Sequence, residues 1–400
     1  MNSENRLSNL LRSEQGLALP MTLMALSLIT TLALAFLTLT ASEPVIASNH
    51  MATAQARAMA EAGVERALWA LSAGSTAPGT SGSIPDAPMP NPAPDPYNGS
   101  YVSMGYGGFK VTVVNGAQSN ERIITAVGYV PDNVKPVAIE KIQVTAMRMK
   151  WLDPPCAICA GGEAPTGLVT EVQLAGAATV RASTASGAEY CPGVTPTAAT
   201  MSQGTIVTDG TPQQTAPDGG VAQLTNQPAS AFSQSLFTDA DMAMLKEYAQ
   251  LYGTYLQGSQ SWSSPPPNGV VFVDTPSGTP FTASSPSSDI INVDVHGNWG
   301  TASWSGWLIV AGSVQLSGNI KMDGLIYAQN DVSVNGTGTG GFTGSIISTN
   351  RMDSTSTSID SDSIGNAPVT YNCHNVRDGG GTISKRWFLK PGTFTEPVGS

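Results

Sequence analysis

The first long pattern in the chain is an apolar run near its N-terminus. Residues 17–42 carry no charge and are mostly Leu, Ala, Met, Thr and Ile. A helix of this length is sufficient to cross the hydrocarbon core of a bilayer. Arg6 and Arg12 precede the run and Glu43 follows it, so the positive-inside bias places residues 1–16 in the cytoplasm and the rest of the chain outside.

A cleaved signal peptide is the alternative interpretation of this run. Its apolar core is usually about 7–15 residues, which is much shorter than the run here, although Thr40-Ala41-Ser42 could mimic a cleavage site. Residues 45–72 favour a longer helix, because they are rich in Ala and their apolar positions recur at spacings of three and four. Pro44 is expected to kink this helix, since it removes one backbone donor.

Sequences on both sides of the run carry a family resemblance. Ser13-Glu14-Gln15-Gly16 precedes it, and Ala60-Glu61-Ala62-Gly63-Val64-Glu65-Arg66-Ala67-Leu68 follows it. This order resembles the N-terminus of type IV pilins and is closest to the PilX-like minor pilins. The resemblance covers about residues 10–72. It implies a subunit that packs its helix beside those of other pilins in a filament.

The resemblance also implies how the chain is processed. A prepilin peptidase would remove the leader, residues 1–16, by cutting between Gly16 and Leu17, and Leu17 would then be N-methylated. The mature helix would occupy residues 17–73. The expected partners are the peptidase, other pilins and inner-membrane pilus assembly proteins. The chain would cross the inner membrane once before it enters an extracytoplasmic filament.

One position departs from the usual pilin pattern. The fifth mature residue is a glutamate in most pilins and is Met21 here. In the family, that carboxylate is thought to neutralise the terminal amine of the subunit already in place. A subunit with no neighbour above it needs no such carboxylate, so Met21 favours a tip or initiating position, where the K component of type II secretion is also placed. The alternative is that PilX-like proteins simply dispense with the residue.

Two further segments follow the helix. Residues 74–98 are dense in proline and almost uncharged, which is typical of an extended linker. Residues 99–150 are expected to form a small antiparallel sheet, because they contain alternating apolar and polar positions. The predicted strands of this minimal pilin head are 101–114, 121–130 and 137–149.

A repeat dominates the rest of the chain. Residues 306–318 align with 324–336 at an offset of 18, and a third copy begins at Gly344. Short alternating strands with Gly and Asn at the corners predict stacked coils. We therefore expect an α+β protein whose head, residues 151–350, resembles a right-handed parallel β-helix or solenoid. A helix over 238–257, capped by Thr238 with Asp241 at the capping-box position, would be inserted in it, and 351–400 would form a cap or tail.

Composition narrows the possible functions. Only 12 % of the residues are charged and the net charge is −11. This composition argues against helical bundles over most of the length, and it offers no basic face for nucleic acid. No carboxylate column forms in the aligned coils, and no catalytic fingerprint occurs. We therefore expect no enzyme activity, no cofactor and no metal.

The cysteines have three possible roles. Cys156, Cys159, Cys191 and Cys373 suit disulfides outside the cytosol, although their three possible pairings cannot be distinguished. The alternatives are a redox pair, from the spacing of Cys156 and Cys159, and a zinc site. Asp353, Asp360 and Asp362 could bind calcium, but a solvated turn is the simpler interpretation.

The clustered tryptophans Trp299, Trp304 and Trp307 could present a surface to a host or surface glycan, or to a protein partner. Alternatively, they cap the end of the solenoid core. The sequence thus predicts a minor pilin that acts in pilus assembly, initiation or tip adhesion. A type II secretion pseudopilin and a membrane-tethered β-helix enzyme acting on polysaccharide are the alternatives.

Overall fold

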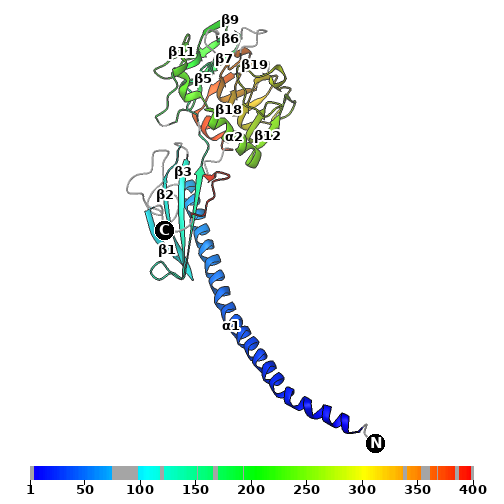
Figure 1. Ribbon diagram of the computed structural model, residues 1–400. Helices are drawn as coiled ribbons and strands as arrows, with labels where there is room; N and C mark the ends of the chain where they lie inside the picture. The colour runs from blue at the N-terminus through cyan, green and yellow to red at the C-terminus, as the bar shows by residue number, and fades with distance from the viewer. Residues whose placement is uncertain are drawn as a thin grey trace. The chain divides into compact units, whose positions relative to one another are not determined.

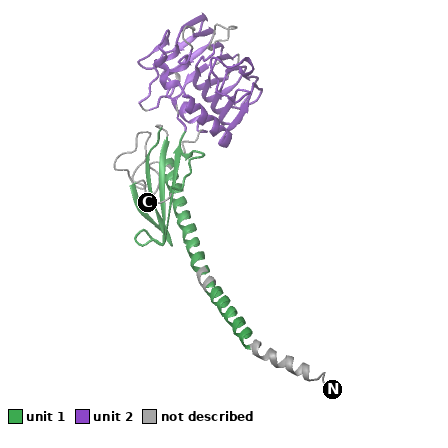
Figure 2. Ribbon diagram, viewed as in Figure 1, with its two compact units in different colours: residues 1–148, 386–400 green, residues 149–385 purple. Residues whose placement is uncertain are grey.

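The computed structural model divides the chain into two compact units (Figure 2). Unit 1 consists of residues 1–148 and 386–400, and unit 2 of residues 149–385. The described residues are 4–73, 98–117, 121–150, 152–164, 170–191, 193–336, 340–352, 361–366, 368–382 and 387–397. The predicted linker, 74–98, lies outside this set except for its last residue.

Helix α1 (Glu4–Ala73) dominates unit 1 (Figure 1). It contains both Pro20 and Pro44. It begins before Gly16, and it does not end at Pro44, where a kink was expected. The side chains described in its first part are exposed, whereas those of Ala56, Ala60 and other small residues further along are fully buried. Small side chains allow the helix to lie close to the sheet that covers it.

The antiparallel sheet of unit 1 has the strand order β1-β2-β3-β4-β23. Its strands are β1 (Asn98–Met104), β2 (Gly107–Asn115), β3 (Glu121–Val130), β4 (Ala138–Met147) and β23 (Phe388–Leu389). The single strand predicted over 101–114 is two strands, because Gly105 adopts a φ of +59° and turns the chain. Apolar residues of β2, β3 and β4 pack on α1 to form the core of the unit.

The C-terminal segment belongs to unit 1 and not to the head. Strand β23 pairs antiparallel with β4, and Trp387 is buried in the same core as α1. Its ring lies 5.2 Å from the guanidinium carbon of Arg122 and 5.2 Å from that of Arg148. The cap or tail expected over 351–400 is therefore divided, because its last part completes the antiparallel sheet.

Unit 2 contains two parallel sheets that enclose one apolar core. The larger sheet consists of β5 (Cys156–Ala160), β7 (Thr179–Arg181), β8 (Ala198–Ser202), β10 (Gln213–Thr215), β11 (Val221–Leu224), β12 (Thr254–Gln257), β14 (Gly269–Asp274), β16 (Trp304–Val310), β18 (Lys321–Ala328), β20 (Gly341–Ser348) and β22 (Pro368–Tyr371). The smaller sheet consists of β6 (Glu171–Gly176), β9 (Thr205–Gly210), β13 (Gln260–Trp262), β15 (Asn292–Val295), β17 (Ser313–Ser317), β19 (Val332–Gly336) and β21 (Ser361–Gly365). From β12 to β22 the chain alternates between the two sheets.

The predicted repeat register is confirmed. Strands β16 and β18 pair with Gly306 opposite Gly324, and β18 and β20 pair with Gly324 opposite Gly344. A Cβ on Gly324 would collide with the carbonyl oxygen of Gly306, and one on Gly344 with that of Gly324. Glycine is therefore required in this column, because the coils approach each other through the backbone.

The order of the coils in space differs from their order in the chain. The chain enters unit 2 at β5, in the interior of the larger sheet, and proceeds to β8 and β11. After α2 it resumes at β12, the edge strand of the larger sheet at the end away from β10, and at β13, the edge strand of the smaller sheet at the end away from β9. From there it returns coil by coil. Strands β20, β21 and β22 then pair with β5, β6 and β7. The first and last coils of the unit are thus neighbours.

Helix α2 (Asp239–Tyr252) has the predicted cap, with Thr238 and Asp241 forming a capping box. It is shorter than the predicted 238–257, because the chain turns at Gly253 and continues as β12. The side chains of Leu245 and Ala249 are buried, whereas Tyr252, which helical spacing places on the same face, is 63 % exposed. The short helix α3 (Cys373–Asp378) and the 3-10 helices η2 (Thr184–Ser186), η3 (Ala229–Ser235) and η4 (Ser287–Asp289) complete the unit.

Candidate functional site

The exposed first part of α1 is the most extensive apolar surface among the described residues. Leu19–Leu37 is long and apolar enough to cross a membrane, and none of it is buried. Met21 is 68 % exposed within it. The proposed cleavage residues, Gly16 and Leu17, lie in the helical range just before this segment, but their side chains are outside the described residues. The N-terminal apolar helix is a possible membrane anchor.

The structure pairs all four cysteines. Cys156 bonds to Cys159 within β5, and Cys191 bonds to Cys373 across a sequence separation of 182. The second bond joins the loop after η2 to the start of α3, so it fastens the first coil of unit 2 to the last. Both bonds are buried. None of the four cysteines is free in this structure.

The tryptophans do not form an exposed surface, so of the two interpretations of Trp299, Trp304 and Trp307 the one that presents them to a glycan or partner is wrong. Their exposed fractions are 7 %, 0 % and 1 %. Trp299 and Trp304 belong to the core between the sheets. Trp307 lies on the outer face of the larger sheet, where its Nε1 donates to Val376 O of α3 at 2.7 Å. The alternation along β16 could not distinguish this face from an exposed one, because α3 comes from a distant part of the chain.

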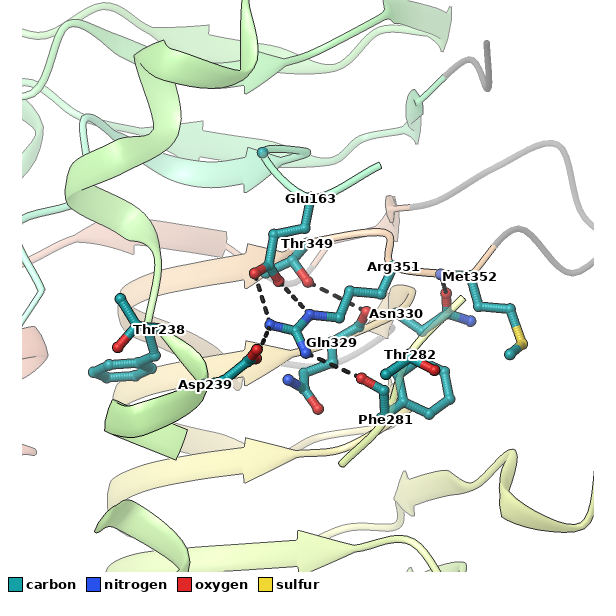
Figure 3. A network of polar contacts seen from close by, with 12 residues as sticks. Glu163, Thr238, Asp239, Phe281, Thr282, Gln329, Asn330, Thr349, Arg351 and Met352 are labelled. Carbon is teal, nitrogen blue, oxygen red and sulfur yellow. Dashed lines mark hydrogen bonds and ion pairs between the residues drawn. The ribbon is translucent and has the colours of Figure 1, made fainter. Parts of the chain in front are cut away.

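Arg351, just after β20, is the centre of a polar network (Figure 3). Its Nε and Nη2 donate to the two carboxylate oxygens of Glu163 at 2.6 and 2.7 Å. Nη2 also donates to Asp239 Oδ1 at 3.0 Å, and Nη1 to Phe281 O at 3.0 Å. Burial lowers the pKa of Arg351, but the bonds and charge of Glu163 raise it by more, so the net shift is upward. The bidentate pair joins the loop after β5 to the segment after β20, and the contact with Asp239 adds the first turn of α2.

A second ion pair lies beside the same helix. Lys246 Nζ is 2.6 Å from Asp274 Oδ2 and donates to Gly278 O at 2.7 Å. Tyr255 Oη donates to the same Asp274 oxygen at 2.9 Å. Burial lowers the pKa of Lys246, but Asp274 raises it by more. Asp239 and Asp274 both line the cavity next to α2.

Sequence reasoning missed these pairs, since their members are far apart in the chain and follow no motif. Within the described ranges, no three His, Cys, Asp or Glu side chains are placed to hold a metal ion. Asp353 and Asp360 of the candidate calcium run lie outside those ranges, and Asp362 accepts a bond from Val334 N at 3.0 Å.

Comparison with known proteins identifies no family. No family model matches the chain, and no curated protein matches its sequence. Among solved structures, the chain is similar to the competence-associated pilin ComZ from Thermus thermophilus, with 14 % identity over 86 % of this chain and 97 % of that one. The TM-score is 0.24, which is too low for the likeness to support a shared fold or function.

Proposed function

We propose that this chain is a PilX-like minor pilin, a structural subunit of a type IV pilus or related filament. The observation that carries the proposal is the division of α1. One uninterrupted helix has an exposed apolar first part, Leu19–Leu37, and a second part that forms the core of an antiparallel sheet. A simple membrane anchor does not need this continuity. A subunit that is extracted from the membrane and then packs its helix against others in a filament does need it.

The sequence before the helix supports the same proposal. Ser13-Glu14-Gln15-Gly16 precedes the apolar segment, as in a prepilin leader. We infer that prepilin peptidase cuts between Gly16 and Leu17, that Leu17 is methylated, and that the chain first crosses the inner membrane with its N-terminus in the cytoplasm. Other pilins and the inner-membrane assembly proteins would be its partners.

Unit 2 would be the distinctive part of the subunit. We infer that its two parallel sheets form a right-handed solenoid head, and that this head primes assembly or presents an adhesive tip surface. Met21 in place of the usual glutamate favours the tip. Mass spectrometry of purified filaments tests this position, because a tip subunit is present at very low copy number and a distributed one is not.

Processing tests the pilin proposal directly. Gly16→Glu should block maturation, because a site that accepts glycine has no room for a charged side chain, while Gly16→Ala should be cleaved at least in part. The measurement is N-terminal sequencing of the membrane-extracted protein, which should give methylated Leu17 for the natural chain. A mature chain beginning near Glu43 would instead indicate a signal peptidase and contradict the proposal.

Two alternative functions predict different experimental results. A type II secretion pseudopilin would co-purify with secretion components instead of pilus subunits.

A membrane-tethered enzyme acting on polysaccharide is favoured by one observation, the presence of Asp239 and Asp274 on the same cavity. Release of reducing ends from envelope polysaccharide, lost in Asp274→Asn, would support the enzyme. We propose a non-catalytic role, because Asp239 pairs with Arg351 and Asp274 with Lys246.

A further inference from the structure

A cavity of about 150 Å³ opens beside α2 in unit 2. Much of its wall is apolar and consists of Met242, Ala243, Phe272, Phe281 and Ala311. A space of this volume is comparable to one that holds a benzene ring. The cavity therefore suits a small group with an apolar part.

The charged residues of the wall are already paired. Lys246 contacts Asp274 at 2.6 Å, and Arg351 contacts Asp239 at 3.0 Å. A charged ligand would have to compete with one of these pairs, and the competition would cost it much of its binding energy. A neutral ligand faces no such competition.

Gln329, which follows β18, supplies the polar group that lacks a partner. It lines the cavity and is only 3 % exposed. Its backbone oxygen accepts from Thr349 Oγ1 at 3.2 Å, but no group of the described chain pairs with its side-chain amide. Figure 3 shows this amide turned away from the Arg351 pairs. The amide is open to the cavity, so a neutral ligand there can accept from its nitrogen or donate to its oxygen.

We propose that this cavity binds the acetamido group of an N-acetylated sugar. The methyl group would contact the apolar wall and the carbonyl would accept from Gln329 Nε2, while the N–H, which is trans to the carbonyl, would face the open side of the cavity. Asp239 also lines the cavity, and its side chain is 80 % exposed. Its carboxylate can therefore accept bonds from the hydroxyls of the sugar ring outside. The inference rests on the proposed function, which places unit 2 outside the cell, and names the ligand of an adhesive head.

Titration of the detergent-purified full chain tests the proposal. The probes are N-acetylglucosamine and glucose, which lacks the acetamido group, and binding is followed by ligand-observed NMR. We expect N-acetylglucosamine to bind at least tenfold more tightly. Gln329→Met preserves the shape and removes the amide, so it should weaken binding about tenfold or more. Ala243→Phe, at an exposed position of α2, should obstruct the cavity without disturbing the core.

Gln315→Met is the matched control, because Gln315 lies on β17 of the other sheet and outside the cavity. It should bind as the natural chain does. Equal affinity for the two sugars, or undiminished binding by Gln329→Met at an unchanged melting temperature, would overturn the proposal. Filament incorporation is measured on the same variants and does not depend on the cavity. A chain that enters filaments but binds no sugar refutes this inference alone, and failure of the natural chain to enter filaments refutes the pilin proposal.

Discussion

Asp362 is a half-buried carboxyl that is expected to make the stability of unit 2 depend on pH. It lies on β21 opposite Ser333 of β19. Burial raises the pKa of Asp362, and the bonds from Ser333 and Val334 oppose this shift only in part. An acid whose pKa is raised by folding binds its proton more tightly in the folded state. The free energy of unfolding therefore decreases as pH rises from the unfolded pKa through the folded one.

We expect Asp362→Asn to stabilise unit 2 at neutral pH. Asparagine keeps an oxygen to accept the bond from Val334 N and carries no charge to bury. Its melting temperature should exceed that of the natural chain at pH 7, and the two should converge below about pH 3, where the natural carboxyl is protonated even when unfolded. Calorimetry of the full chain measures this difference, and an advantage that persists undiminished in acid would contradict the assigned cause.

Strand β19 tests the coil register at the scale of an element. Val332 is 1 % exposed and pairs with Val314 of β17. Val332→Asp would bury an unpaired charge, at a cost of about 3–5 kcal/mol. We expect unit 2 of this variant to lose its resistance to protease in the full chain.

The matched control for Val332→Asp is Ser317→Asp, because Ser317 points to the other face of its sheet and pairs with the neutral Asn335. It should be nearly silent. Sequence alone suggests Ser333→Asp for this purpose, but the structure places Ser333 opposite Asp362, where a second carboxylate would be repelled. Equal protease sensitivity of Val332→Asp and Ser317→Asp would refute the register.

The whole molecule is a chain in which unit 2 is inserted into unit 1. The C-terminal segment returns to the antiparallel sheet, where Trp387 N donates to Ser72 Oγ of α1 at 2.9 Å and Lys390 pairs with Glu121 at 2.8 Å. Both ends of unit 2 are therefore continuous in the chain with unit 1, which contains α1.

Trp387→Ala should destabilise unit 1 by about 3–5 kcal/mol, because it leaves a large cavity in the core that α1 shares with the sheet. Limited proteolysis should then cut within 98–147 while unit 2 stays intact. Phe394→Ala is the control, since Phe394 is 48 % exposed in the same segment. Similar proteolysis of both variants would mean that Trp387 does not hold the segment in place.

Local patterns were sufficient for several elements. The apolar run and the Ala-rich residues after it determined α1, Thr238 and Asp241 determined the start of α2, and the spacing of Gly306 and Gly324 determined the coil register. In each case the residues concerned are close together in sequence, or repeat at a constant offset. Backbone preference, capping and alternation act over such short distances.

Tertiary structure alone decided what joins distant parts of the chain. It placed the first coil beside the last, paired Cys191 with Cys373, returned Trp387 to unit 1 and covered Trp307 with α3. It also brought Arg351 to Glu163 and left the Gln329 amide in a cavity. These contacts depend on which surfaces meet after the coils have stacked, and alternation along a strand is the same whether its outer face meets water or another helix.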